Sequence, residues 1–138
     1  MGLRSFIHRL TAPKIGGIVE PRPIKLALVV NHGLGMKKGK IAAQVGHASV
    51  QTLLSAGSSM PQMIDAWLAQ GQKKVCLKAV DEHHMKEIQA KARHLKLHTN
   101  QTIDAGHTQI PKGSFTVLAI GPSYEDEIDA ITGDLPLL

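Results

Sequence analysis

The chain has 138 residues, of which 43% are hydrophobic and 20% are charged, and its formal net charge is +5. This length is most simply a single domain with a sizeable core, and no apolar run reaches the roughly 18 residues of a membrane-spanning helix. A lone cysteine, Cys76, excludes an intramolecular disulfide, and its apolar neighbours predict a buried thiol in a reducing compartment.

Basic residues are concentrated in the first 80 positions, where Glu20 and Asp65 are the only acids. The acid-free stretch around Lys37, Lys38 and Lys40 suits a polyanionic partner, of which nucleic acid is the commonest. Only 3% of the residues are aromatic, so base-stacking platforms are not expected. Recognition of a nucleic acid through its phosphates and its shape is favoured instead.

The first 23 residues differ in composition from the rest. They are basic and end in Pro21-Arg-Pro23. We expect residues 1–23 to be a basic extension, either disordered or acting as an amphipathic surface segment or a targeting segment, because such a sequence buries too little apolar surface to order itself. The folded domain is then predicted to span residues 24–138.

The remaining sequence alternates between strand and helix patterns. The first predicted strand, residues 25–31, has a continuous apolar centre, which indicates burial on both faces. Further strands are predicted at residues 74–80, 99–104 and 114–121, the last ended by Pro122, and helices at residues 38–55, 61–70, 82–97 and 123–131. The inner stripe of the third helix is expected to be Met85, Ile88, Ala92 and Leu95.

This order of elements is typical of an α/β layer fold. The first two connections between strands are long enough for right-handed parallel crossovers. The last connection, residues 105–112, is too short for one, so the last two strands should be antiparallel. We therefore predict a single α/β domain with a mixed four-stranded sheet and helices packed on both faces.

A polar row marks the helix predicted at residues 38–55. Lys40, Gln44 and His47 fall at i, i+4 and i+7 and so share one face. A solvated face is the usual explanation for such a row. A second polar cluster, Asp104-Ala-Gly-His-Thr-Gln109, follows another predicted strand, and the two clusters together favour an active site. The opposite, core-facing side of the helix is expected to present Ile41, Val45, Ala48 and Thr52.

Other kinds of site are not supported by the sequence. The turn at residues 33–40 lacks the spacing of a phosphate-binding loop, and no Gly-x-Ser-x-Gly elbow is present. His94 and His98 are four residues apart but have no nearby cysteine or paired acid. We expect neither a metal site nor a cofactor.

The candidates that remain are Lys40, Asp104, Thr108 and Thr116. Thr116 shares a face of its predicted strand with Leu118 and Ile120, an unusual place for a hydroxyl unless it faces a site. The alternative is a threonine bonded to backbone, and the sequence favours neither reading over the other.

Five sequence blocks, found in one order, carry a resemblance to a known family. They are Met36-Lys-Lys-Gly-Lys-Ile-Ala-Ala-Gln44 with His47-Ala48, Trp67-Leu-Ala-Gln-Gly-Gln72, Asp104-Ala-Gly-His-Thr-Gln-Ile110, Gly113-Ser-Phe-Thr-Val-Leu-Ala-Ile-Gly-Pro122 and Ile131-Thr-Gly-Asp-Leu135. From about Lys25 to Leu138 the chain resembles the type II (archaeal and eukaryotic) peptidyl-tRNA hydrolases. The resemblance implies hydrolysis of the ester that joins a peptide to the terminal ribose of tRNA.

Such a reaction needs a positioned water, stabilisation of the tetrahedral oxyanion and a proton for the leaving hydroxyl. The resemblance assigns Asp104 to orient or activate the water, directly or through Thr108. Lys40 would keep Asp104 ionised and offset the oxyanion charge.

The same resemblance assigns substrate contacts to the neighbouring polar residues. Gln44 and Thr116 would position the substrate, while His47 is equally a packed helix histidine or a proton shuttle. Lys37 and Lys38, beside the free N–H groups of a helix start, would suit tRNA phosphates.

The chain departs from the family pattern at Asn31 and Gly33, where an Arg-x-Asp pair is usual, and at Lys112, where proline is usual. The departures at Asn31 and Gly33 favour the alternative of a non-catalytic module that binds tRNA or a protein. Lys40, Asp104 and Thr108 together favour the enzyme. The expected partner is peptidyl-tRNA and not DNA, with a homodimer left open. The expected location is the cytoplasm, or mitochondria if residues 1–23 are a targeting segment.

Overall fold

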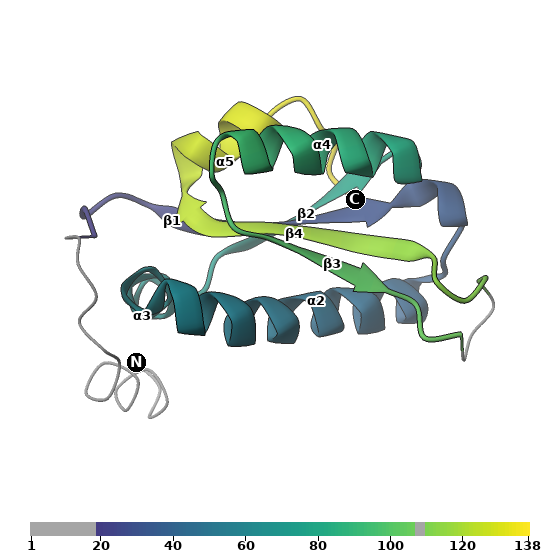
Figure 1. The fold of residues 1–138 in the computed structure, drawn as a ribbon, viewed down its shortest axis with the longest axis horizontal. Coiled ribbons are helices and arrows are strands. Elements are labelled where there is room, and N and C mark those ends of the chain that lie inside the picture. The colour runs from purple at the N-terminus through teal and green to yellow at the C-terminus, as the bar shows by residue number, and fades with distance from the viewer. Residues whose placement is uncertain (1–18, 107–109) are drawn as a thin grey trace.

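The structure is a computed structural model that describes residues 19–106 and 110–138 (Figure 1). Strands and helices alternate along the described chain. Their order is β1 (Ile24–Asn31), the short 3-10 turn η1 (His32–Leu34), α2 (Lys38–Ser59), α3 (Pro61–Ala69), β2 (Lys74–Ala79), α4 (Glu82–His94), β3 (Thr99–Ile103), β4 (Phe115–Tyr124) and α5 (Glu125–Thr132).

The four strands form one mixed sheet in the order β2-β1-β4-β3. β1 and β2 are parallel, and β4 runs antiparallel to both β1 and β3. Helices α2 and α3 cover one face and α4 and α5 the other, so the sheet is the middle of three layers (Figure 1). The predicted α/β fold, with helices on both faces and the last two strands antiparallel, is confirmed.

Two separate apolar cores flank the sheet. Val29 of β1 packs with Met85, Ile88 and Ile128 on the side of α4 and α5. Neighbouring β1 residues pack with Ile64 and Trp67 on the side of α3 and α2. Because successive strand residues face opposite sides, the continuous apolar run of β1 serves both cores, as its sequence predicted.

Strand β4 does not end at Pro122, so that prediction is wrong. The strand continues to Tyr124, and its pairing with β1 shifts between Lys25 and Ala27. Lys25 is opposite Ser123, and Ala27 is opposite Ile120. The shift forms a bulge that takes in Pro122, and bulges tolerate a residue without a backbone N–H.

Helix α4 ends at His94, three residues earlier than predicted. Lys96 adopts a left-handed φ of 58°, and the N–H of Leu97 donates to the carbonyl of Ala92 at 3.0 Å, which closes the helix end. Leu95, predicted to be in the core, is therefore 50% exposed. Gln89 is buried instead and accepts a hydrogen bond from Gln101 of β3 at 2.6 Å.

Cys76 packs against the core on the side of α2 and α3, but it is only partly buried, so the prediction of a buried thiol is only partly met. Its partial burial raises the pKa of the thiol. The chain after α5 runs along the outer side of β2. Lys78 N–H donates to the carbonyl of Pro136 at 2.9 Å, and Leu138 N–H donates to that of Cys76 at 3.1 Å.

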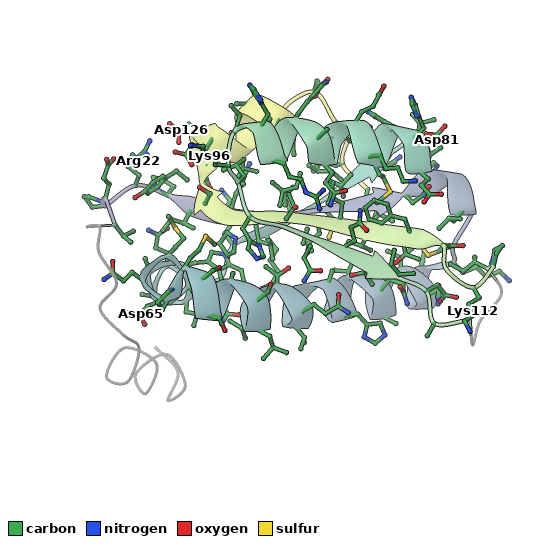
Figure 2. All side chains as sticks on the ribbon, viewed as in Figure 1. Arg22, Asp65, Asp81, Lys96, Lys112 and Asp126 are labelled. Carbon is green, nitrogen blue, oxygen red and sulfur yellow. The ribbon has the colours of Figure 1, made fainter. Side chains whose placement is uncertain are left out.

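The residues immediately before β1 contact the end of β4 and the start of α5. The backbone N–H of Glu20 donates to the Tyr124 hydroxyl at 2.8 Å, and the Arg22 guanidinium lies 3.8 Å from the centre of the Tyr124 ring. Arg22 also pairs with Asp126 at 2.9 Å, and both residues are labelled in Figure 2. Residues 1–18 lie outside the described part, so the predicted extension stays a prediction.

Candidate functional site

Lys40 and Asp104 form an ion pair at one end of the sheet. Lys40 is in the first turn of α2, and Asp104 directly follows β3. Lys40 Nζ lies 2.5 Å from Asp104 Oδ1, and the two side chains are 16% and 2% exposed. The two polar clusters that the sequence places 64 residues apart are therefore joined by one contact, with the carboxylate almost completely removed from solvent.

The backbone around Asp104 fixes the orientation of its carboxylate. Oδ2 accepts a hydrogen bond from the N–H of Gly106 at 2.9 Å, so each carboxylate oxygen has its own donor. Gly106 has a φ of +88°, and a Cβ there would lie 2.8 Å from Cβ of Lys112. The tight turn expected at Gly106 is confirmed, and it requires glycine for both reasons.

The side chain of Thr116 points to the opposite face of the sheet from the one predicted. The pairing of β3 with β4 shifts between Thr102 and Ile103, so that Thr102 is opposite Val117 and Ile103 is opposite Phe115. The bulge turns the side chain of Thr116 toward α2. Its predicted shared face with the neighbouring strand residues is thus wrong, since Leu118 and Ile120 are in the core under α4 and α5.

The Thr116 hydroxyl contacts both α2 and β3. It lies 2.6 Å from Gln44 Oε1 and 3.0 Å from the carbonyl oxygen of Thr102. Gln44 is 5% exposed and belongs to the buried side of α2 with Ala48 and Thr52. Its predicted place opposite the core is therefore wrong.

The four residues predicted for the core-facing side of α2 are all buried or partly buried. Ala48 and Thr52 are buried, and Ile41 and Val45 are partly buried against the same core. His47 is exposed and faces a cavity lined also by Lys40. The polar row of the sequence is thus divided between a buried amide and an exposed imidazole.

Two cavities meet at Lys40. The first has a volume of about 310 Å³ and a wall of mixed polar and apolar surface. It is lined by Lys40, Gln44, His47, Gln51, Thr102, Ile103, Asp104 and Ala105. The second has a volume of about 600 Å³ and a more apolar wall. It is lined by Leu34, Gly35, Met36, Lys37, Gly39, Lys40, Ala43 and Ile110. We call them the polar cavity and the apolar cavity.

Lys37 and Lys38 are exposed at the start of α2, beside the apolar cavity. No side chain caps this helix start, and the first N–H groups of a helix lack partners within it. The ammonium groups and the helix start therefore leave donors available for an anion. Thr108, the remaining predicted site residue, lies outside the described residues.

Gln51 and Thr102 line the polar cavity but were missed by sequence reasoning. The Thr102 hydroxyl donates to Gln51 Oε1 at 3.2 Å. Both could have been found from spacing, because Gln51 continues the row of Gln44 and His47 along α2 and Thr102 is two residues before Asp104.

The departure at Asn31 and Gly33 lies apart from the wall of either cavity. Asn31 is 3% exposed, and its Nδ2 donates to the carbonyl of Phe115 at 3.0 Å. A Cβ at Gly33 would lie 2.7 Å from the carbonyl oxygen of Val80, so this turn does not accept a side chain without moving. Asn31 thus has a structural contact, and the ion pair of Lys40 with Asp104 forms without the Arg-x-Asp residues.

Residues 19–106 and 110–138 contain no group of three or more His, Cys, Asp or Glu side chains arranged to hold a metal ion. None of their helices is both long and apolar enough to cross a bilayer.

Comparison with known proteins identifies close relatives. Residues 24–138 match the family model described as peptidyl-tRNA hydrolase PTH2. A peptidyl-tRNA hydrolase of Methanocaldococcus jannaschii is 44% identical over 115 residues, which cover 83% of this chain and 100% of that protein. Peptidyl-tRNA hydrolase 2 of Saccharomyces cerevisiae is 44% identical, over 85% of this chain and 59% of its own. The human protein named peptidyl-tRNA hydrolase 2, mitochondrial, is 45% identical, over 82% of this chain and 63% of its own.

Proposed function

This chain belongs to the peptidyl-tRNA hydrolase PTH2 family, and from that membership we propose that it hydrolyses the ester bond of peptidyl-tRNA, releasing free tRNA and peptide. The observation that carries the proposal is the buried ion pair of Lys40 and Asp104 beside two open cavities. No cofactor enters the proposed reaction, because a carboxylate, an ammonium and a water supply its chemistry.

The proposed mechanism begins with a water positioned by Asp104. Lys40 and the N–H of Gly106 hold the carboxylate in one orientation. The water bound to it is therefore already oriented toward the ester carbonyl. As the carbonyl oxygen becomes an oxyanion, the ammonium of Lys40 offsets its charge. The proton lost by the water is returned to the ribose oxygen as the ester bond breaks. Thr108 is proposed as a relay between Asp104 and the water.

Substrate positioning is assigned to the polar cavity and to the start of α2. Gln44, fixed by Thr116, and His47 are proposed to contact the terminal nucleotide, and Thr116 acts by holding the Gln44 amide in place. Lys37 and Lys38 are proposed to contact phosphates, which hold the substrate without reading its sequence.

A non-catalytic binding module of the same fold is the second candidate. It is favoured only by the departures from the family pattern at Asn31 and Gly33. A pure binder of an anionic nucleic acid gains nothing from a carboxylate beside its ligand, so Asp104 favours hydrolysis.

We also propose that tRNA rather than DNA is the nucleic acid bound and that the protein is cytoplasmic unless residues 1–23 direct it to mitochondria. A homodimer is an open alternative to the monomer.

The direct test is release of free tRNA from an N-acetylated aminoacyl-tRNA by the purified full-length chain. We expect multiple turnovers by the wild-type chain and loss of turnover in Asp104→Asn, with Lys91→Ala on the outer side of α4 as the matched control for a surface change. Retained tRNA binding without any release by the wild type would instead support the binding module.

A further inference from the structure

The apolar cavity itself has been assigned no part of the substrate so far, although Lys37 and Lys40 at its wall have been assigned to phosphates and to the oxyanion. Leu34, Met36, Ala43 and Ile110 contribute its apolar wall, and its volume of about 600 Å³ lies within the range of about 300–1,000 Å³ typical of small-ligand pockets. Lys40 belongs to both cavities. A substrate whose reacting carbonyl lies at Lys40 would therefore extend into a different cavity on each side of the ester.

The chemistry of the two walls distinguishes which half of the substrate enters which cavity. The terminal ribose and its base carry several hydrogen-bonding groups, which are costly to bury without partners. The polar cavity offers such partners in Gln44, His47 and Gln51, whereas the apolar cavity offers mainly aliphatic carbon. Among the described residues that line the apolar cavity none is aromatic, so this part of its wall offers no stacking surface for a base.

We propose that the apolar cavity binds the side chain of the amino acid esterified to the tRNA, and that it favours apolar side chains at that position. The inference rests on the proposed function and deepens it, because it makes Leu34, Met36, Ala43 and Ile110 determinants of specificity for the acyl group. Glycine at this position of the substrate leaves the cavity empty and gains nothing from it.

Gly39 provides a way to fill the cavity without touching the ion pair. It lines the cavity from the first turn of α2, and a Cβ placed there meets no atom within 4 Å. Gly39→Leu therefore adds an aliphatic side chain at the cavity wall while improving the helix propensity. Gly46→Leu is a matched control on the same helix, since Gly46 also has open space for a Cβ and lines neither cavity.

The experiment compares kcat/KM for N-acetyl-leucyl-tRNA and N-acetyl-glycyl-tRNA. We expect the wild type to favour the leucyl substrate by about tenfold, the discrimination that burial of an aliphatic group typically gives. Gly39→Leu, and separately Ala43→Leu, should abolish this preference by slowing the leucyl reaction, with the glycyl reaction little changed. Gly46→Leu should keep the wild-type preference.

An equal loss on both substrates in Gly39→Leu and Ala43→Leu would overturn the acyl-pocket proposal, as would a wild type that treats both substrates alike. The terminal adenosine of the tRNA can also be replaced. If Gly39→Leu and Ala43→Leu changed the effect of that replacement on kcat/KM rather than the effect of the amino acid, the cavity would belong to the nucleotide and the proposal would be overturned. Failure of the proposed function is distinguishable, because the wild type would then release tRNA from neither substrate.

Discussion

The Thr116 hydroxyl lies 2.6 Å from the Gln44 side-chain oxygen, and both side chains are almost fully buried between α2 and the sheet. This contact joins α2 to the sheet one turn after Lys40, whose ammonium pairs with Asp104. A buried polar pair of this kind is costly to break on one side only, because the remaining partner is left without a hydrogen bond.

Thr116→Val should therefore destabilise the fold by about 1–3 kcal/mol, the cost of leaving the Gln44 amide unsatisfied. Urea unfolding measures this change, with Thr99→Val in β3 as a control that leaves Gln44 untouched. The double variant Gln44→Leu with Thr116→Val should lose less than the sum of the two single variants, because neither side chain of the pair is then left facing an unsatisfied partner. Strict additivity would show that the contact carries no coupling energy.

Asp104→Asn and Lys40→Ala are each expected to lower the rate of tRNA release by roughly two or more orders of magnitude, as is typical for loss of a positioned electrostatic or acid–base group. Asparagine keeps the shape of Asp104 and its contact from Gly106, so the loss should be in kcat. Circular dichroism and the melting temperature check that the fold survives. Near wild-type rates at saturating substrate in either variant would refute the assignment of the pair.

Substrate binding should weaken steeply with salt because Lys37 and Lys38 are proposed to neutralise phosphates. Each alanine substitution should reduce the slope of log K against log salt by about 0.7–0.9 and affect KM more than kcat. Lys86→Ala, on the exposed side of α4, is the control expected to leave the slope unchanged. A binding constant that is flat between low and moderate salt would contradict the polyanion argument.

Truncation separates the contacts before β1 from the preceding chain. Removal of residues 1–18 should leave both the melting temperature and the rate unchanged. Removal of residues 1–22 also deletes the contacts of Arg22 with Asp126 and Tyr124, which are exposed enough to contribute only about 1 kcal/mol. A large fall in melting temperature for the shorter deletion would show that residues 1–18 stabilise the domain.

His98 should make stability depend on pH. Burial lowers the pKa of its imidazole below the ordinary 6.5, with the backbone at Gly121 partly opposing this. Below pH 6.5 the unfolded chain then binds the proton more readily than the native one, so the free energy of unfolding falls as pH drops from 6.5 toward the native pKa. Above 6.5 the residue has no such effect.

Melting temperatures at about pH 8 and about pH 5.5 measure this dependence. His98→Gln should reduce the difference between the two values, while His94→Gln, at an exposed position on α4, should leave it as in the wild type. An unchanged difference in His98→Gln would mean that other groups are responsible.

The layer order and strand directions could be predicted because they depend on features that are local in sequence. The length of the apolar run in β1 indicates burial on two faces, and the short chain between β3 and β4 permits only an antiparallel pair. The pairing of Lys40 with Asp104 was predicted from the family resemblance. The residues alone predicted only that the two polar clusters form one site, because each cluster lies at the end of a well-marked element. Ends of parallel strands and starts of helices are brought together by the topology itself.

The errors at Thr116, Pro122 and Gln44 arise where the pairing between neighbouring strands is irregular. Alternation along β4 predicts the face of Thr116 only if the pairing is regular, and the bulge opposite β3 reverses it. The bulge against β1 likewise accommodates Pro122 within the strand. Each bulge depends on the strand that pairs with β4, so neither bulge could be predicted from the residues of β4 alone. Gln44 was misplaced for the same reason, since its buried partner is Thr116.

The chain that follows α5 has a consequence for how the sheet meets other molecules. Its backbone hydrogen bonds occupy the outer side of β2 at Cys76 and Lys78, so that edge is closed to a further strand. Unpaired strand edges are where sheets grow into dimers or aggregates. Among the described strands, β3 is left as the outer strand at the opposite edge, immediately before Asp104. Any growth of this sheet by a neighbouring strand would thus begin next to the proposed catalytic pair of Lys40 and Asp104 and compete with the substrate for space.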